Sequence, residues 1–198
     1  MFTGIIQETG RVVSFGAGSE SWDLVIESEQ TRQDATVGDS IAINGCCLTI
    51  SRLSAGQFHF NVLEETRRRT NFNGFVAGSL VNLESSLRFG GKIGGHFVTG
   101  HIDTTGEIIA FEPRGKDHYL RVKVAEAWGR YIVHKGSIAI DGISLTIAEV
   151  KAEEFAVWLI PHTMLATNLR SRRVGDAVNL EFDLLGKHVE KLLLARTP

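Results

Sequence analysis

The side chains best suited to chemistry in this sequence are thiols and imidazoles. Cys46 and Cys47 are neighbours, and His96 and His101 lie five positions apart. On a strand, side chains at that spacing point to opposite faces of the sheet. Because the sequence also contains no HExxH or CxxC motif, we expect no metal site. Taken alone, Cys47 would be a small buried side chain and Ser144 an ordinary strand serine.

Charge and glycine patterns argue against two other kinds of chemistry. The 198-residue chain has 21 basic and 23 acidic residues, a net charge of −2, and its arginines form only short clusters such as Arg67–Arg69. Nucleic-acid-binding proteins usually carry a basic excess, so we expect no nucleic acid as a partner. Residues 90–93, Gly-Gly-Lys-Ile, lack the upstream glycine and the Ser or Thr of a phosphate-binding P-loop.

The cellular compartment is predicted from membrane-span and secretion signals, neither of which the sequence shows, and from the state of the cysteines. No apolar run approaches the roughly 20 residues of a membrane span, and residues 1–6 have neither the basic nor the long apolar region of a secretory signal. A disulfide between adjacent cysteines is strained, so Cys46 and Cys47 are predicted to be free thiols. Free thiols are typical of a reducing environment, and we therefore predict a cytoplasmic protein without a membrane partner.

An internal repeat gives these residues their context. Ser40–Ile50 reads SIAINGCCLTI and Ser137–Ile147 reads SIAIDGISLTI, so eight of eleven positions are identical at an offset of 97 residues. The same offset, or one of 96, relates further segments: Val81–Glu84 with Val178–Glu181, and Thr3-Gly4 with Thr99-Gly100. The chain is therefore a duplicated unit, in which Cys47 is equivalent to Ser144, Ile5 to His101, Glu65 to His162, and Asn44 to Asp141.

Each half of the repeat is predicted to be mainly β. Short runs of Val, Ile, Leu and Phe are broken by turn residues every 8–12 positions or so, and Phe58–Val62 alternates like a half-buried strand. Short helices are expected at Glu126–Val133 and from Pro161 onward. We predict a mainly β fold of two tandem six-stranded Greek-key β-barrels with short helices, over residues 1–96 and 97–185, followed by a C-terminal helix at 186–198.

Several motifs together resemble the riboflavin synthase family, whose chains contain two lumazine-binding barrels. The resemblance covers nearly the whole sequence and is carried by Met1–Ile6, Asn44–Thr49, Gly94–His96, Gly100–Ile102, Lys135-Gly136, Asp141–Thr146 and Ile160-Pro161. It implies a dismutation in which two molecules of 6,7-dimethyl-8-ribityllumazine exchange a four-carbon unit. The products are riboflavin and 5-amino-6-(D-ribitylamino)uracil, and the resemblance implies that this last step of riboflavin biosynthesis uses no cofactor or metal.

The resemblance also implies roles for individual residues. Cys47 and Ser144 would be the polar side chains nearest the reacting carbons, and His101 would be an acid or base for the C7-methyl proton. The other implied catalytic residues are Phe2, Thr3, Ser40, His96 and Asp141. The implied substrate-binding residues are Gly4, Ile5, Ile6, Cys47, Leu48, Thr49, Val62, Glu65, Thr66, Gly100, His101, Ile102, Lys135, Ser144, Leu145, Thr146, Ile160, Pro161, His162, Thr163 and Asp183.

The assembly implied by the resemblance is a homotrimer with sites between chains, each site binding two lumazines. We therefore expect Cys47 of one chain to lie opposite Ser144 and His101 of another. Leu185, Val189 and Leu192 have the four-three spacing of a short coiled-coil seam, which would pack on a partner chain or on its own barrel. The resemblance is also compatible with an association with lumazine synthase.

Two other functions have to be weighed against this enzyme. Antenna proteins of luminous bacteria resemble the same family and hold a lumazine or flavin without turnover. The presence of Cys47, Ser144 and His101 together favours the enzyme over such a binding protein. Flavin reductases use similar barrels, but this chain lacks a GxGxxG motif and a separate nucleotide-binding domain.

Overall fold

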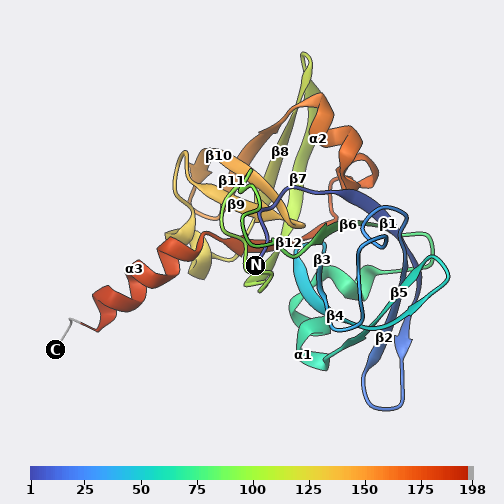
Figure 1. Ribbon diagram of the computed structural model, residues 1–198. Helices are drawn as coiled ribbons and strands as arrows, with labels where there is room; N and C mark the ends of the chain where they lie inside the picture. Colours follow the sequence, from blue (N-terminus) through green and yellow to red (C-terminus); the bar gives the residue numbers. More distant parts are fainter. Residues whose placement is uncertain (196–198) are drawn as a thin grey trace.

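Two closed antiparallel β-barrels form most of the molecule and lie side by side in the computed structural model, which describes residues 1–195 (Figure 1). The first barrel has the strand order β1-β2-β5-β4-β3-β6, and the second has the order β10-β11-β8-β7-β12-β9. The predicted pair of six-stranded Greek-key barrels is therefore confirmed.

The elements of the first repeat are β1 (Glu8–Ala17), β2 (Trp22–Glu27), β3 (Ser40–Ile43), β4 (Cys46–Ser54), β5 (Gln57–Val62), α1 (Glu64–Arg69), the 3₁₀ helix η1 (Asn71–Gly74) and β6 (Leu80–Ser85). Those of the second are β7 (Thr104–Arg114), β8 (Asp117–Lys123), the 3₁₀ helix η2 (Glu126–Tyr131), β9 (Ser137–Ile140), β10 (Ile143–Lys151), β11 (Glu154–Leu159), α2 (Pro161–Ala166), the 3₁₀ helix η3 (Asn168–Ser171) and β12 (Ala177–Phe182). The segment predicted as a helix at Glu126–Val133 is thus a shorter 3₁₀ helix.

The barrels close because their long strands bend at equivalent points. The register shifts after Val12 and after Ile50 in the first barrel, and after Ile108 and after Ile147 in the second. Each shift is a β-bulge, which adds local twist and curvature to a strand. Alternating apolar side chains, such as Phe58 and Phe60 on β5, then fill each barrel with its own core.

The β3–β4 and β9–β10 hairpins meet where the two barrels touch. Asn44-Gly45 and Asp141-Gly142 both have positive φ at their two turn residues, as type I′ hairpins require. A Cβ on Gly45 would lie 2.7 Å from the backbone nitrogen of Gly142, so the two turns are in close backbone contact. The residues that follow these turns are Cys46-Cys47 and Ile143-Ser144.

A buried polar network joins the barrels around these turns. Asp141 is fully buried, and its carboxylate accepts hydrogen bonds from Asn71 Nδ2, Asn168 Nδ2, Arg172 and the backbone N–H of Asn179. Further amide bonds across the interface involve Asn44, Asn82 and Asn168. Buried hydrogen-bond networks specify one arrangement of the groups they join, so this network helps to fix how the barrels sit against each other. Within the described residues, Asn44 Nδ2, Asn71 Oδ1 and Arg172 Nε have no hydrogen-bond partner.

The chain segment before each barrel crosses to the other barrel. Phe2 and Val98 form an antiparallel bridge, with Phe2 N–H donating to Val98 O at 2.7 Å and Val98 N–H donating to Phe2 O at 3.1 Å. Ile6, which precedes the first barrel, packs against the core of the second. Ile102, which precedes the second barrel, packs against the core of the first. The two barrels are therefore interlocked through their leading segments.

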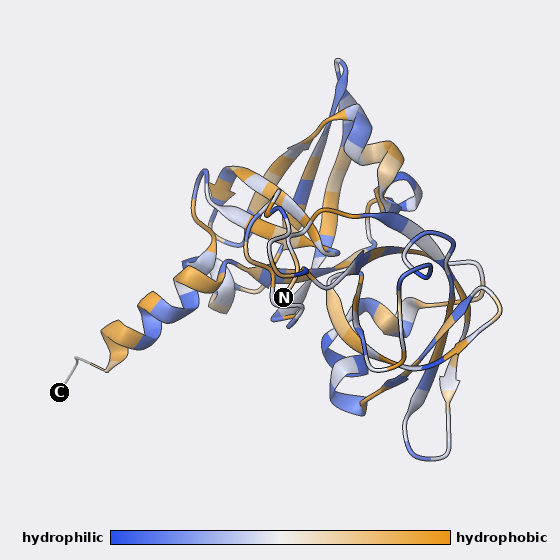
Figure 2. Cartoon of the chain, in the orientation of Figure 1, coloured by the Kyte–Doolittle hydropathy of each residue, from blue (hydrophilic) through white to orange (hydrophobic). Residues whose placement is uncertain are grey.

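The last helix, α3 (Leu184–Leu194), projects from the second barrel (Figure 1). Two of its polar side chains bind its own barrel: Lys187 pairs with Asp103 at 2.6 Å, and Glu190 pairs with Arg130 at 2.6 Å. Hydrophobic residues line the rest of the helix (Figure 2), and Leu185, Val189 and Leu192 are mostly exposed. Residues 196–198 of the predicted tail lie outside the described residues. Within residues 1–195, no helix is long and apolar enough to span a membrane.

Candidate functional site

Cys47 lies against the segment that leads into the second barrel. Its backbone N–H donates to the carbonyl of Gly100 at 2.8 Å. Gly100 has a φ of +83°, and a Cβ there would lie 2.5 Å from Cβ of Cys47, so only glycine fits. His101 follows directly and is exposed. We call Cys47, Gly100 and His101 the Cys47 half-site.

Ser144 has the equivalent relationship with the N-terminal segment. Its backbone N–H donates to the carbonyl of Gly4 at 2.8 Å. Gly4 has a φ of +74°, and a Cβ there would lie 2.6 Å from Cβ of Ser144. The duplicated sequence thus produces duplicated geometry, with each glycine segment seated on the barrel of the other repeat. We call Ser144, Gly4 and His96 the Ser144 half-site.

A serine–histidine pair is present at the Ser144 half-site. His96 Nδ1 and Ser144 Oγ are 2.7 Å apart. Burial lowers the pKa of His96 below its ordinary value of 6.5, and the nearby carboxylate of Asp183 opposes this shift. The ring is therefore neutral near pH 7. The direction of the bond depends on the tautomer: Nδ1 accepts from the Ser144 hydroxyl when the ring hydrogen is on Nε2, a buried atom without a partner among the described residues. This pair is able to move a proton to or from the Ser144 hydroxyl.

The two cysteines differ in environment. Cys46 is 5% exposed, and burial raises the pKa of its thiol to about 12, so it stays protonated. Cys47 is half-buried and belongs to the Cys47 half-site. Both thiols are free, as predicted. Of the two thiols, Cys47 is therefore the more accessible.

The other predicted site residues fall into two groups, one on each barrel. Those of the first barrel lie between β3 and α1: Ser40, Leu48, Thr49, Val62, Glu65 and Thr66. Ser40 pairs with Thr49 across the β3–β4 hairpin, two positions along from Cys47. Ile102 joins this group by packing against the same barrel.

The second group belongs to the second barrel and the N-terminal segment: Ile5, Ile6, Lys135, Leu145, Thr146, Ile160, Pro161, His162, Thr163 and Asp183. Ile160 precedes α2, whose first turn carries Pro161, His162 and Thr163. Lys135, at a φ of +65°, donates its backbone N–H to Ile147 on β10. Asp183 caps α3 by accepting from the N–H of Leu185 at 3.0 Å.

Three of the predicted site residues have neighbours that the sequence did not reveal. His101 was expected with Ser144, but the Gly100–Cys47 bond places it in the Cys47 half-site, because the leading segments cross between barrels. Asp141 lies in the interbarrel network rather than in either half-site, and its oxygens are occupied by protein donors. Phe2 is fully buried between the barrels beside Ala42, Val98 and Ala139, so it packs the interface.

Two buried glutamates near the half-sites were not predicted. Glu84 accepts hydrogen bonds from Thr3, a predicted site residue, and from Gly4; Glu181 accepts bonds from Thr99 and Gly100. Burial raises the pKa of Glu84, and the donors on Thr3, Gly4 and Ile5 oppose the increase. The recurrence of Val81–Glu84 as Val178–Glu181 is the sequence signal from which they could have been found.

Comparisons with known proteins agree with this duplicated arrangement. A family model described as the lumazine binding domain matches residues 3–86 and again 99–183. A riboflavin synthase of Actinobacillus pleuropneumoniae is 44% identical over 196 residues, spanning 99% of this chain and 91% of that protein. A riboflavin synthase of Mycobacterium tuberculosis (strain H37Rv) is 45% identical over 197 residues, covering 98% of each chain.

Solved structures show the same fold. The structure of LumP complexed with riboflavin superposes with a TM-score of 0.86 at 24% identity, covering 92% of this chain and 99% of LumP. LumP complexed with 6,7-dimethyl-8-(1'-D-ribityl) lumazine gives a TM-score of 0.83 at 23% identity, with the same coverage. At this level of identity the likeness supports the two-barrel architecture.

Proposed function

The chain belongs to the riboflavin synthase family of lumazine-binding proteins. We propose that its two half-sites each hold one of the two lumazines that react. It is an enzyme with riboflavin synthase activity. The reaction is the dismutation of two molecules of 6,7-dimethyl-8-ribityllumazine, with transfer of a four-carbon unit from one to the other.

One observation carries the proposal, namely the matched pair of bonds from Cys47 to Gly100 and from Ser144 to Gly4. A reaction that consumes two identical molecules needs two similar binding places with different side chains around them. The repeat supplies the similarity, and the equivalent pairs Cys47/Ser144 and His101/Ile5 supply the difference. Holding two reactants in register lowers the barrier by about 7–11 kcal/mol in ideal cases.

We propose the following roles within the half-sites. At the Ser144 half-site, His96 accepts the hydroxyl proton of Ser144, so that Ser144 delivers or stabilises a nucleophile on its lumazine. At the Cys47 half-site, the exposed His101 moves the C7-methyl proton beside Cys47. Backbone groups of Ile5, Ile6 and Ile160–Thr163 hydrogen-bond the ribityl chain. The remaining residues of each group shape the pocket around the ring.

A homotrimer completes the site in this proposal. Cys47 and Ser144 belong to separate half-sites of one chain, and the Cys47 half-site of one chain would meet the Ser144 half-site of the next. The exposed leucines of α3 support such an assembly, because two of its polar side chains already bind its own barrel and leave Leu185 and Leu192 for a partner. A cytoplasmic location and an association with lumazine synthase stay predictions.

The test is anaerobic incubation of the full chain with 6,7-dimethyl-8-ribityllumazine, followed by chromatography. We expect riboflavin and 5-amino-6-(D-ribitylamino)uracil in equal amounts, with the same yield in excess EDTA. A lumazine that binds and is recovered unchanged would instead identify an antenna-type binding protein. Turnover lost on chelation and restored by one metal would contradict the metal-free mechanism.

A further inference from the structure

Two buried carboxylates occupy equivalent positions on the last strand of each barrel, and the proposed mechanism does not use them. Glu84 lies on β6 and is 4% exposed, and Glu181 lies on β12 and is 2% exposed. A buried carboxylate is costly unless it is well hydrogen-bonded. Their retention in both repeats therefore raises the question of what each carboxylate holds.

Each carboxylate accepts hydrogen bonds from three donors in its own repeat, and the donors of the two repeats are equivalent. Oε1 of Glu84 accepts from Thr3 N–H at 2.7 Å and from Thr3 Oγ1 at 2.8 Å, and Oε2 accepts from Gly4 N–H at 3.0 Å. Oε1 of Glu181 accepts from Thr99 N–H at 2.6 Å and Thr99 Oγ1 at 2.7 Å, and Oε2 accepts from Gly100 N–H at 2.9 Å. Charge-assisted bonds of this kind are among the stronger hydrogen bonds in proteins.

The segment held by Glu181 faces the Cys47 half-site. The N–H of Gly100 donates to this carboxylate on one side, and its carbonyl accepts from the N–H of Cys47 on the other. His101 is the next residue, and its N–H donates to Oγ1 of Thr99, which Glu181 also binds. A carboxylate on the second barrel thus sets the backbone on which His101 approaches the first barrel.

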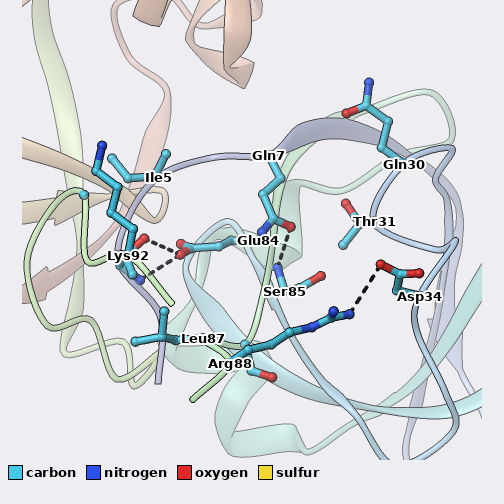
Figure 3. A pocket seen from close by; sticks show the side chains of 13 residues that line it. Ile5, Gln7, Gln30, Thr31, Asp34, Glu84, Ser85, Leu87, Arg88 and Lys92 are labelled. Atoms are coloured by element: carbon cyan, nitrogen blue, oxygen red, sulfur yellow. Dashed lines mark hydrogen bonds and ion pairs between the residues drawn. The ribbon is translucent and has the colours of Figure 1, made fainter. Parts of the chain in front are cut away.

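The segment held by Glu84 faces the Ser144 half-site. Gly4 offers its carbonyl to Ser144, and the carbonyl of Thr3 accepts from the N–H of His96 at 3.1 Å. A chain of contacts therefore runs from Glu84 through Thr3 to His96, whose ring binds Ser144. On its outer side the segment borders a pocket of about 790 Å³ (Figure 3), whose lining includes Thr3, Ile5 and Glu84.

We infer that Glu84 and Glu181 are positioning residues that act crosswise, each placing a half-site on the opposite barrel. Glu181 aligns Gly100 and His101 with Cys47, and Glu84 aligns Gly4 and His96 with Ser144. The catalytic part of this inference rests on the proposed function, whereas the crosswise placement is a property of the fold that is measurable without turnover.

The test compares full-length Glu84→Gln and Glu181→Gln chains with the unmodified protein. Glutamine keeps the size of the side chain but removes the charge and one acceptor oxygen. In Glu181→Gln, hydrogen exchange should accelerate about tenfold or more at Gly100 and Cys47 and stay unchanged at Gly4 and Ser144. Glu84→Gln should show the reverse pattern. Glu107→Gln, an exposed glutamate on β7, serves as the matched control and should change neither segment.

Turnover provides the second readout. Glu84→Gln and Glu181→Gln should each lower kcat about tenfold while KM changes less than about threefold. Misplacing His96 or His101 affects the reacting groups more than the pocket that holds the ring. If the Gln variants fold poorly, Thr99→Val removes one donor to Glu181, and Thr99→Ser should restore both exchange and kcat.

Faster exchange in both segments for either variant, or in neither, would overturn the crosswise inference. Crosswise exchange with unchanged kcat would overturn the positioning role. An unmodified chain without synthase activity would contradict the proposed function alone, because the exchange pattern does not depend on turnover.

Discussion

The backbone N–H of Cys47 and the carbonyl of Gly100 are joined by a 2.8 Å hydrogen bond that links the two barrels at the candidate site. The same bond recurs between Ser144 and Gly4. Gly100 belongs to the second repeat and contacts Cys47 of the first, whereas Gly4 belongs to the first repeat and contacts Ser144 of the second. Neither half-site is therefore complete within one barrel.

The first prediction concerns that contact. Gly100→Ala places a Cβ 2.5 Å from Cβ of Cys47 at a φ of +83°, so it should push His101 away and weaken ligand binding at this half-site about tenfold or more. Gly78→Ala is the matched control, since Gly78 has a φ of +88° and open space around its Cβ. Fluorescence titration with riboflavin measures the difference. Equal effects of the two substitutions would mean that the Cys47 contact is unimportant.

The second prediction is a pH dependence from His96. Its pKa is lowered on folding from 6.5, so below that pH the unfolded chain binds the proton more readily. Stability from the neutral ring is therefore complete above about pH 6.5 and is lost as the pH falls toward the folded-state pKa. Turnover should decline as the pH falls through the folded-state pKa, which lies below 6.5, because a protonated ring cannot accept the Ser144 proton. His96→Gln should lower kcat and remove this decline in a pH–rate profile; a profile with an unchanged acid limb would exclude His96 as its source.

The third prediction concerns the interbarrel network. Asp141→Ala leaves Arg172 without its buried partner and should lower the free energy of unfolding by about 3–5 kcal/mol. The double variant Asp141→Asn, Arg172→Phe copies the first repeat, where Asn44 and Phe75 are equivalent, and should recover most of that loss. Urea unfolding measures both. A loss under about 1 kcal/mol for Asp141→Ala would show that the network does not hold the barrels together.

The fourth prediction concerns α3. Leu185→Ser combined with Leu192→Ser should shift the protein toward monomer in sedimentation, because these exposed leucines are proposed to pack on a partner chain. Lys191→Ser, on the same helix, is the control and should leave the distribution unchanged. A stable trimer in the double variant would show that the helix is not the assembly contact.

The barrels could be predicted from the sequence because the repeat, the alternating strands and the regularly spaced turn residues report on local structure. The crossing of the leading segments could not be predicted, because the repeat shows that Gly4 and Gly100 are equivalent but not which barrel each of them contacts. For that reason His101 was grouped with Ser144. The partners of Asp141 could not be predicted, because the donors that bind its carboxylate come from distant segments. Glu84 and Glu181 were visible as a repeated pair, but their partners emerge only from the fold.

In the proposed assembly, one Cys47 half-site and one Ser144 half-site, from different chains, form each working site. Two variants separate the half-sites: Cys47→Ala with His101→Ala in one chain, and Ser144→Ala with His96→Ala in the other. Each double variant damages only one half-site. Co-expression with two different affinity tags and sequential purification isolates assemblies that contain both chains, so subunit exchange is not required.

The decisive measurement is riboflavin formation by these mixed assemblies. In a cyclic trimer, every mixed assembly has one interface where both half-sites are native, so activity should return to about one-third of the unmodified rate. Each variant purified alone should stay inactive. Mixed assemblies as inactive as their parents would contradict a site shared between chains, because they would show that each site is built within a single chain.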